Sequence, residues 1–122
     1  MCYLWQAGLV PDAMLDGYGF AEIVGARGPF VSDRIRAGIA GWGPGIDYPR
    51  HHHQAEEAYL LLCGSAEFHL QDAPPEVYRS GDVVYVSPNR WHGFRSGEEW
   101  LWMCYLWQAG DLRQTSAFAN LA

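Results

Sequence analysis

The chain has 122 residues, which is enough for one compact domain and too few for two, so we treat residues 1–122 as a single domain. Hydrophobic residues make up 49% of the chain and charged residues 18%, a balance that supports a buried core and excludes a disordered tail. The net charge is −6 and the basic residues form no dense patch, which excludes a nucleic-acid partner.

Short apolar segments separated by glycine- and proline-rich turns follow one another along most of the chain. A short helical turn or a loop is expected at 11–16, and strands are expected at 18–24, 33–42, 48–53, 58–63, 66–70, 77–78, 83–86, 92–95 and 100–107. No long segment has the apolar spacing of an amphipathic helix. Many short strands at close spacing predict an all-β fold, a single small antiparallel β-barrel or sandwich.

Membrane and secretion signals are weak in this sequence. The longest apolar run, at 101–107, is far shorter than the roughly 20 residues that cross a membrane. The N-terminal residues lack the basic start and cleavage site of a signal peptide. Cys2, Cys63 and Cys104 are odd in number and form no close pair, which argues against a disulfide framework. We therefore expect a cytoplasmic protein without a membrane partner.

An eight-residue segment occurs twice. Residues 1–8 and 103–110 both read MCYLWQAG. The copies are about one domain length apart, so they do not belong to a solenoid. Two explanations stay open. The first is an artefact of the sequence boundary, and the second is a duplicated strand that pairs at a sheet edge or exchanges into a neighbouring subunit.

Polar residues with metal-binding side chains follow the strand period between 51 and 59. His51, His53, Glu57 and Tyr59 all have odd numbers, so an extended segment would turn them to one face. His92, on a distant predicted strand, is the candidate for a fourth ligand. Imidazole and carboxylate together suit borderline divalent metals such as zinc, iron, manganese and nickel. The alternative is a solvated polar edge whose histidines gather by accident.

The spacing of these residues matches two known motifs. Residues 45–64 read GIDYPRHHHQAEEAYLLLCG, in which a glycine, His-x-His, a glutamate and a glycine have the spacing of the first motif of the cupin superfamily. Residues 81–92, GDVVYVSPNRWH, resemble the second cupin motif, with Pro88 one place late and Asn89 where the motif has glycine. Asparagine tolerates the left-handed conformation that such a turn needs. The resemblance implies a jelly-roll-like cupin barrel with one divalent metal ion inside it.

A narrower resemblance covers roughly residues 17–115. The first motif, with YGFAEIVGARGPFVSDRI upstream and YLWQAGDL downstream, is similar to the cupin-type dimethylsulfoniopropionate (DMSP) lyases, especially the DddL kind. The resemblance implies that the metal ligands are His51, His53, Glu57 and His92. It also implies that Tyr59 is the catalytic base and that Tyr48 is a second active-site tyrosine. These enzymes cleave DMSP to dimethyl sulfide and acrylate, and ordinary cupins need no tyrosine at position 59.

Aromatic side chains are the candidates for binding the sulfonium group of such a substrate, because a cation is attracted to aromatic faces. The candidates for this role are Trp42, Tyr48, Tyr105 and Trp107. Each of them has a core role as its alternative. His69 is expected at the surface and His52 on the outward face of its strand.

Three functions stay open from the sequence. The first is a metal-dependent carbon–sulfur lyase that acts on DMSP or a similar small carboxylate. The second is another small cupin metalloenzyme, such as an iron-dependent dioxygenase or an isomerase, and the third is a cupin that binds a small ligand without turnover. The metal is zinc, manganese, iron(II) or nickel, with zinc or manganese slightly preferred, and a homodimer is the expected assembly if the chain associates.

Overall fold

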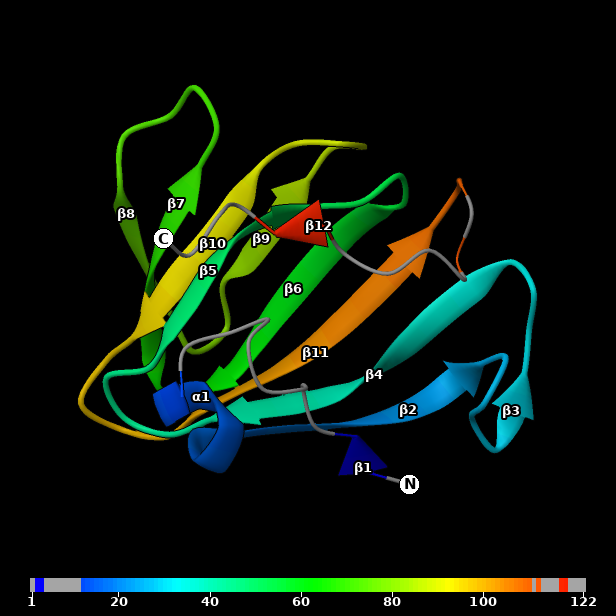
Figure 1. The fold of residues 1–122 in the computed structure, drawn as a ribbon, viewed down its shortest axis with the longest axis horizontal. Helices are drawn as coiled ribbons and strands as arrows, with labels where there is room; N and C mark the ends of the chain where they lie inside the picture. The colour runs from blue at the N-terminus through cyan, green and yellow to red at the C-terminus, as the bar shows by residue number, and fades with distance from the viewer. Residues whose placement is uncertain (1, 4–11, 111, 113–116, 119–122) are drawn as a thin grey trace.

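Two β-sheets pack face to face in a computed structural model that describes residues 2–3, 12–110, 112 and 117–118 (Figure 1). The larger sheet has the order β1 (Cys2–Tyr3), β2 (Tyr18–Gly25), β4 (Ile35–Trp42), β11 (Leu101–Gln108), β6 (Glu56–Cys63) and β9 (Val83–Val86), with β3 (Phe30–Val31) beside β2. The smaller sheet has the order β12 (Ala117–Phe118), β5 (Asp47–His52), β10 (His92–Ser96), β7 (Ser65–Leu70) and β8 (Glu76–Arg79). One short helix, α1 (Asp12–Gly17), precedes β2.

This architecture confirms the predicted all-β, jelly-roll-like fold. Pairing is antiparallel throughout the described strands except between β2 and β3. The predicted barrel is not closed, because the two sheets are not joined by hydrogen bonds into a ring among the described residues. The molecule is therefore a jelly-roll sandwich whose interior lies between the two sheets.

Strand periodicity explains which side chains fill that interior. Along β11 the burial alternates strictly, so that Leu101, Met103, Tyr105 and Trp107 are buried while Trp102 and Leu106 are exposed. The predicted strands agree with the observed ones to within two residues at each end. The short strands Phe30–Val31 and Ala117–Phe118 were not predicted, and Cys2–Tyr3 was predicted only as one of two explanations of the repeat. Of the two alternatives predicted at 11–16, the helical turn is the one observed, as α1.

Left-handed residues close two turns beside the interior. Gly64 has φ +82°, and a Cβ there would lie 2.4 Å from the carbonyl oxygen of Trp100, so a glycine is required. Asn89 has φ 60°, as expected for the asparagine that replaces the motif glycine. The Asn89 N–H donates to the carbonyl oxygen of His53 over 2.8 Å, which ties the turn before β10 to the segment after β5.

The two copies of the repeated segment occupy different positions. Cys2 and Tyr3 form an edge strand paired with Ala21 and Phe20 of β2. The later copy lies in the centre of the same sheet, where β11 pairs with both β4 and β6. Residues 1 and 4–8 lie outside the described part of the chain, so the origin of the repeat stays a prediction. No helix among the described residues is long and apolar enough to cross a membrane.

Candidate metal centre

Three histidines converge in the interior, two from strands of the smaller sheet and one from the loop that follows β5. His51 lies on β5, His92 lies opposite it on β10, and His53 follows the end of β5. One ring nitrogen of each lies within 4.8 Å of the others, and all three side chains are buried. The predicted histidine set is therefore brought together, and these residues can hold a metal ion.

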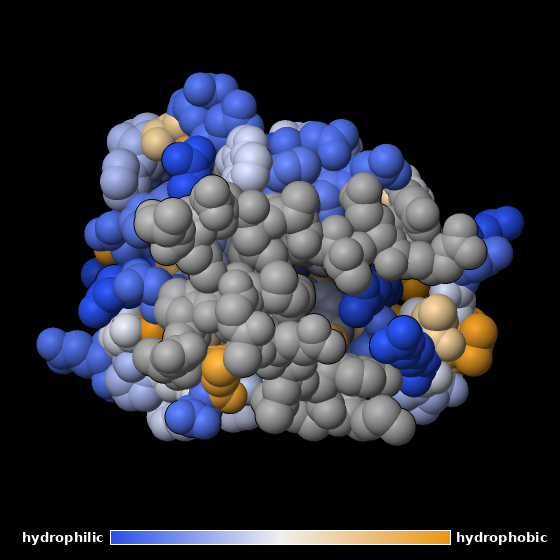
Figure 2. Space-filling model, in the orientation of Figure 1, coloured by the Kyte–Doolittle hydropathy of each residue, from blue (hydrophilic) through white to orange (hydrophobic). Residues whose placement is uncertain are grey.

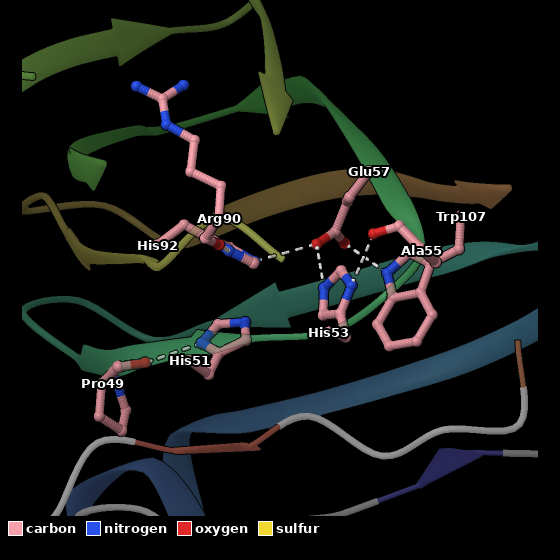
Figure 3. Close-up of polar contacts among 8 residues, drawn as sticks. All are labelled: Pro49, His51, His53, Ala55, Glu57, Arg90, His92 and Trp107. Atoms are coloured by element: carbon pink, nitrogen blue, oxygen red, sulfur yellow. Dashed lines mark hydrogen bonds and ion pairs between the residues drawn. The ribbon is translucent and has the colours of Figure 1, made fainter. Parts of the chain in front are cut away.

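Backbone carbonyls fix the orientation of each ring. The Nδ1 atoms of His51, His53 and His92 lie 2.8, 2.9 and 2.8 Å from the carbonyl oxygens of Pro49, Ala55 and Arg90, respectively (Figure 3). A carbonyl oxygen can only accept, so each Nδ1 carries a proton, and Nε2 is the nitrogen left for other partners. Burial, followed by the nearby His92, lowers the pKa of His51 well below its usual value and favours the neutral ligand form.

Glu57 approaches the cluster from the larger sheet. Its Oε1 lies 3.1 Å from His53 Nε2 and 3.2 Å from His92 Nε2. Burial alone raises the pKa of Glu57, but the contacts with His53 and His92 outweigh it and hold the pKa far below the usual range. A carboxylate oxygen facing two imidazole lone pairs needs a cation between them, either protons or a metal ion. Three nitrogens and one carboxylate oxygen are a donor set that suits borderline divalent ions, so the residues fit the expected metal.

Tyr59 lies two residues further along β6 and is buried. Its ring centre is 6.2 Å from that of His92. Burial raises the pKa of Tyr59 well above that of a free tyrosine, and the charge of Glu57 raises it further. The hydroxyl is therefore a neutral phenol unless a cation beside it offsets both effects.

Aromatic rings line the interior on the other side of His51. Tyr48 stacks on His51 with ring centres 4.3 Å apart, and Trp42 lies 5.7 Å from Tyr48. The indole Nε1 of Trp42 is buried and has no hydrogen-bond partner among the described residues. Tyr105 faces inward opposite Tyr59 in the β11–β6 register. The structure thus places these three candidate aromatics in the interior, and the fourth candidate, Trp107, is also buried.

Three further side chains belong to this site. Trp107 was predicted as a candidate for binding the sulfonium group and not as a partner of Glu57, and Glu22 and Arg36 were not predicted. The Trp107 Nε1–H donates to Glu57 Oε2 over 2.8 Å. Arg36 lies over the Trp107 ring and pairs with Glu22. The only sequence signal was a charged residue, Glu22, on the inward-facing positions of the strand at 18–24. A surface cavity of about 1260 Å³ has Glu22 and Arg36 in its wall.

The remaining histidines lie outside the centre, as expected. His69 is partly exposed and its Nε2 contacts Glu67 Oε1 at 2.7 Å. His52 is half-buried against Trp91, with ring centres 4.4 Å apart. Neither ring is part of the converging group.

The fold and this arrangement define a cupin with a histidine-rich interior centre. A cupin-like protein from Thermotoga maritima shares the fold, with a TM-score of 0.71 and 14% identity over 97% of this chain and 89% of that one. Residues 3–102 match the family model described as dimethylsulfoniopropionate lyase. The chain belongs to this family.

Two curated relatives and one solved structure agree with that assignment. The chain is 35% identical over 108 residues to the dimethylsulfoniopropionate lyase DddQ of Ruegeria pomeroyi, and 29% identical over 113 residues to the putative lyase DddL of Cereibacter sphaeroides. The crystal structure of DddQ from Ruegeria pomeroyi superposes with a TM-score of 0.91 at 29% identity, covering 100% of this chain and 62% of that one. This chain spans about half the length of the curated relatives, 53% and 47%. The family is confirmed, whereas the matches do not separate the DddL kind from the DddQ kind.

Proposed function

We propose that the chain is a metal-dependent lyase that cleaves DMSP to dimethyl sulfide and acrylate. The observation that carries the proposal is a buried tyrosine, Tyr59, beside the carboxylate of a His51–His53–His92–Glu57 cluster, in a chain of this family. The relatives DddQ and DddL, which bear the name of this activity, support it.

Tyr59 is the proposed base of a β-elimination. The proton on the carbon next to the substrate carboxylate moves to the oxygen of Tyr59 in its phenolate form, which becomes a neutral phenol, and the electron pair of that C–H bond forms the C=C bond of acrylate. The C–S bond breaks, and its electron pair leaves with dimethyl sulfide, which removes the positive charge from sulfur. When bound, a divalent cation supplies positive charge that stabilises the developing negative charge on the carboxylate and favours the phenolate of a nearby tyrosine.

The aromatic side of the interior is the proposed substrate site. A sulfonium is a diffuse cation that gains from contact with aromatic faces, and Tyr48, Trp42 and Tyr105 supply such faces. The indole N–H of Trp42, which has no partner among the described residues, supplies a hydrogen-bond donor for a polar ligand. Tyr48 contacts both His51 and the Trp42 ring, so it is placed between the two sides.

Headspace detection of dimethyl sulfide tests the lyase directly. The protein is loaded separately with zinc, manganese, iron(II) or nickel, incubated with DMSP and compared with Tyr59→Phe and His92→Ala. Loss of the base is expected to cost roughly 10²–10⁴-fold in rate. Matched controls are Tyr85→Phe and His69→Ala, which change exposed or partly exposed residues of the same types.

Each outcome of this experiment supports or refutes a different part of the proposal. Turnover that is lost in Tyr59→Phe but kept in Tyr85→Phe supports the lyase and its base together. Turnover that survives in Tyr59→Phe keeps the lyase and moves the base, with Tyr48 next in line. No dimethyl sulfide with any of the four metals would refute the lyase and favour another cupin metalloenzyme or a binding protein.

A second copy of the chain is the proposed partner of the outer face of the larger sheet. Large apolar side chains of three adjacent strands are 39–61% exposed there: Leu60, Leu62, Val83, Tyr85, Trp102 and Leu106. Side chains of this size expose roughly 500–600 Å² together, and a polar rim would bring that to the about 800 Å² per partner of a stable interface. The face drawn in Figure 2 differs from this apolar face, because hydrophilic residues predominate there among the described residues.

The oligomeric state in solution tests this surface. Val83→Lys is expected to lower the mass measured by light scattering after size-exclusion chromatography, whereas Val77→Lys, an exposed valine on the other sheet, is expected to leave it unchanged. Equal masses for both variants and the parent would refute the interface.

Cys63 and Cys104 are free thiols, which favours a reducing compartment such as the cytoplasm for the chain.

A further inference from the structure

A row of three side chains crosses the larger sheet and ends at the proposed ligand Glu57. Arg36 on β4 is opposite Trp107 on β11, and Trp107 is opposite Glu57 on β6. Residues that are directly opposite on neighbouring strands have Cβ atoms about 4.5–5.5 Å apart, so their side chains interact. The sheet register therefore brings a cation, an indole and a carboxylate into contact in that order.

Trp107 makes two contacts with the cluster. Its Nε1–H donates to Glu57 Oε2 over 2.8 Å, and its ring stacks on His53 with centres 3.9 Å apart and planes 24° apart (Figure 3). The other carboxylate oxygen, Oε1, is the one that faces His53 and His92. The two oxygens of Glu57 thus have separate partners, the indole for one and the histidine nitrogens for the other.

The indole is itself held from behind. The guanidinium carbon of Arg36 lies 5.0 Å from the centre of the Trp107 ring. Arg36 Nε donates to Glu22 Oε1 over 2.6 Å, and the Arg27 backbone N–H donates to Glu22 Oε2 over 2.8 Å. The side chain of Glu22 is only 4% exposed, so this ion pair is shielded from solvent on the carboxylate side.

We infer that Trp107, held by the Glu22–Arg36 pair, is a positioning residue that makes Glu57 a one-oxygen ligand. The indole N–H holds Oε2 on the Trp107 side of the carboxylate, so that Oε1 is the oxygen that faces the histidine nitrogens. A one-oxygen carboxylate leaves more of the coordination sphere for an exchangeable ligand. The inference rests on the proposed metal centre but not on the identity of the substrate.

Binding of Co²⁺ alone tests the role of Trp107 without any turnover. Trp107→Phe keeps a ring against His53 and removes the N–H. Its Co²⁺ absorption spectrum is expected to change because the coordination number changes, and its Kd for Co²⁺ is expected to rise roughly 10–100-fold. Trp102→Phe, on the outer face of the same strand, is the matched control and is expected to keep the parent spectrum and Kd.

Arg36 separates positioning from simple packing. Arg36→Met removes the cation with little change in side-chain length, and it is expected to weaken Co²⁺ binding less than Trp107→Phe does. Arg36→Lys, which keeps the charge, is expected to restore part of the affinity. Arg95→Met is the matched control, because Arg95 pairs with Asp47 in an exposed ion pair on the other sheet.

The outcomes distinguish this inference from the proposals on which it depends. If the parent binds Co²⁺ and Trp107→Phe has the spectrum and Kd of Trp102→Phe, the positioning role is refuted while the metal centre stands. If the parent itself binds no Co²⁺, the metal centre and the inference are refuted together. A folded far-ultraviolet circular dichroism spectrum for metal-free Trp107→Phe verifies that a changed Kd reports the site rather than unfolding.

Discussion

The two sides of the interior differ in how their polar atoms are satisfied. On the histidine side, each Nδ1 has a carbonyl partner and both oxygens of Glu57 have nitrogen partners. On the aromatic side, rings pack edge-to-face or tilted, and the Trp42 N–H is buried without a partner among the described residues. Paired polar atoms on the histidine side are expected around the proposed metal ion, which stays bound. The aromatic side keeps an unpaired donor, as expected where the proposed substrate binds and its products leave.

The largest expected effect comes from removing a ligand on the histidine side. His92→Ala deletes one of three converging nitrogens, and its side chain is fully buried. Loss of a partner that merely orients a ligand already costs up to roughly 100-fold in metal affinity, so loss of the ligand is expected to cost more. Metal content after dialysis measures this, with His69→Ala as the control. His92→Gln, a closer fit to the same space, serves if the alanine variant does not fold, and retention of metal in both variants would refute the role of His92.

Adding metal to the parent protein is expected to have the next largest effect. An ion that binds only the folded state at 100 times its Kd contributes about 2.7 kcal/mol, which raises Tm by of the order of 10 °C for a domain of this size. Thermal unfolding with and without zinc measures the shift. Glu57→Gln, which keeps the shape and removes the charge, is expected to show a clearly smaller shift. An equal shift in both proteins would place the metal elsewhere.

The aromatic side is expected to respond more weakly and in a different quantity. Trp42→Phe keeps an aromatic ring beside Tyr48 and removes the N–H. If that N–H donates to substrate, its loss is worth roughly 0.5–1.5 kcal/mol and raises KM for DMSP about 2–12-fold. Metal affinity is expected to stay at the parent value, which separates the two sides of the interior. A weaker metal affinity with an unchanged KM would remove the distinction between them.

Sequence reasoning predicted which residues form the histidine side but not the contacts that hold Glu57 from behind, for a physical reason. His51, His53 and Glu57 lie within seven consecutive positions, and strand alternation predicted that they share one face of a single extended segment. They do converge, but from opposite sheets, because the chain leaves β5 after His52 and enters β6 of the larger sheet at Glu56. Glu22, Arg36 and Trp107 meet only because β4 lies between β2 and β11 in the sheet. That order is set by long-range pairing, which the alternation within each strand does not specify. The strand at 56–63 likewise begins two residues earlier than predicted, where Glu56 accepts a hydrogen bond from Gln108 of β11.

The smallest expected effect concerns the turn that supports the histidine side from outside. Asn89 has φ 60° and its N–H donates to the carbonyl oxygen of His53. Asn89→Ala places a Cβ without a compensating amide in the left-handed region and is expected to lower the free energy of unfolding by about 1 kcal/mol. Asn89→Gly, which restores the residue of the cupin motif, is expected to leave it near the parent value. Urea denaturation measures both, and because the strain lies at Asn89 while the N–H is a backbone group, metal affinity is expected to change little in either. Equal stability of the two variants would show that the left-handed conformation at position 89 causes no strain in a residue that has a Cβ.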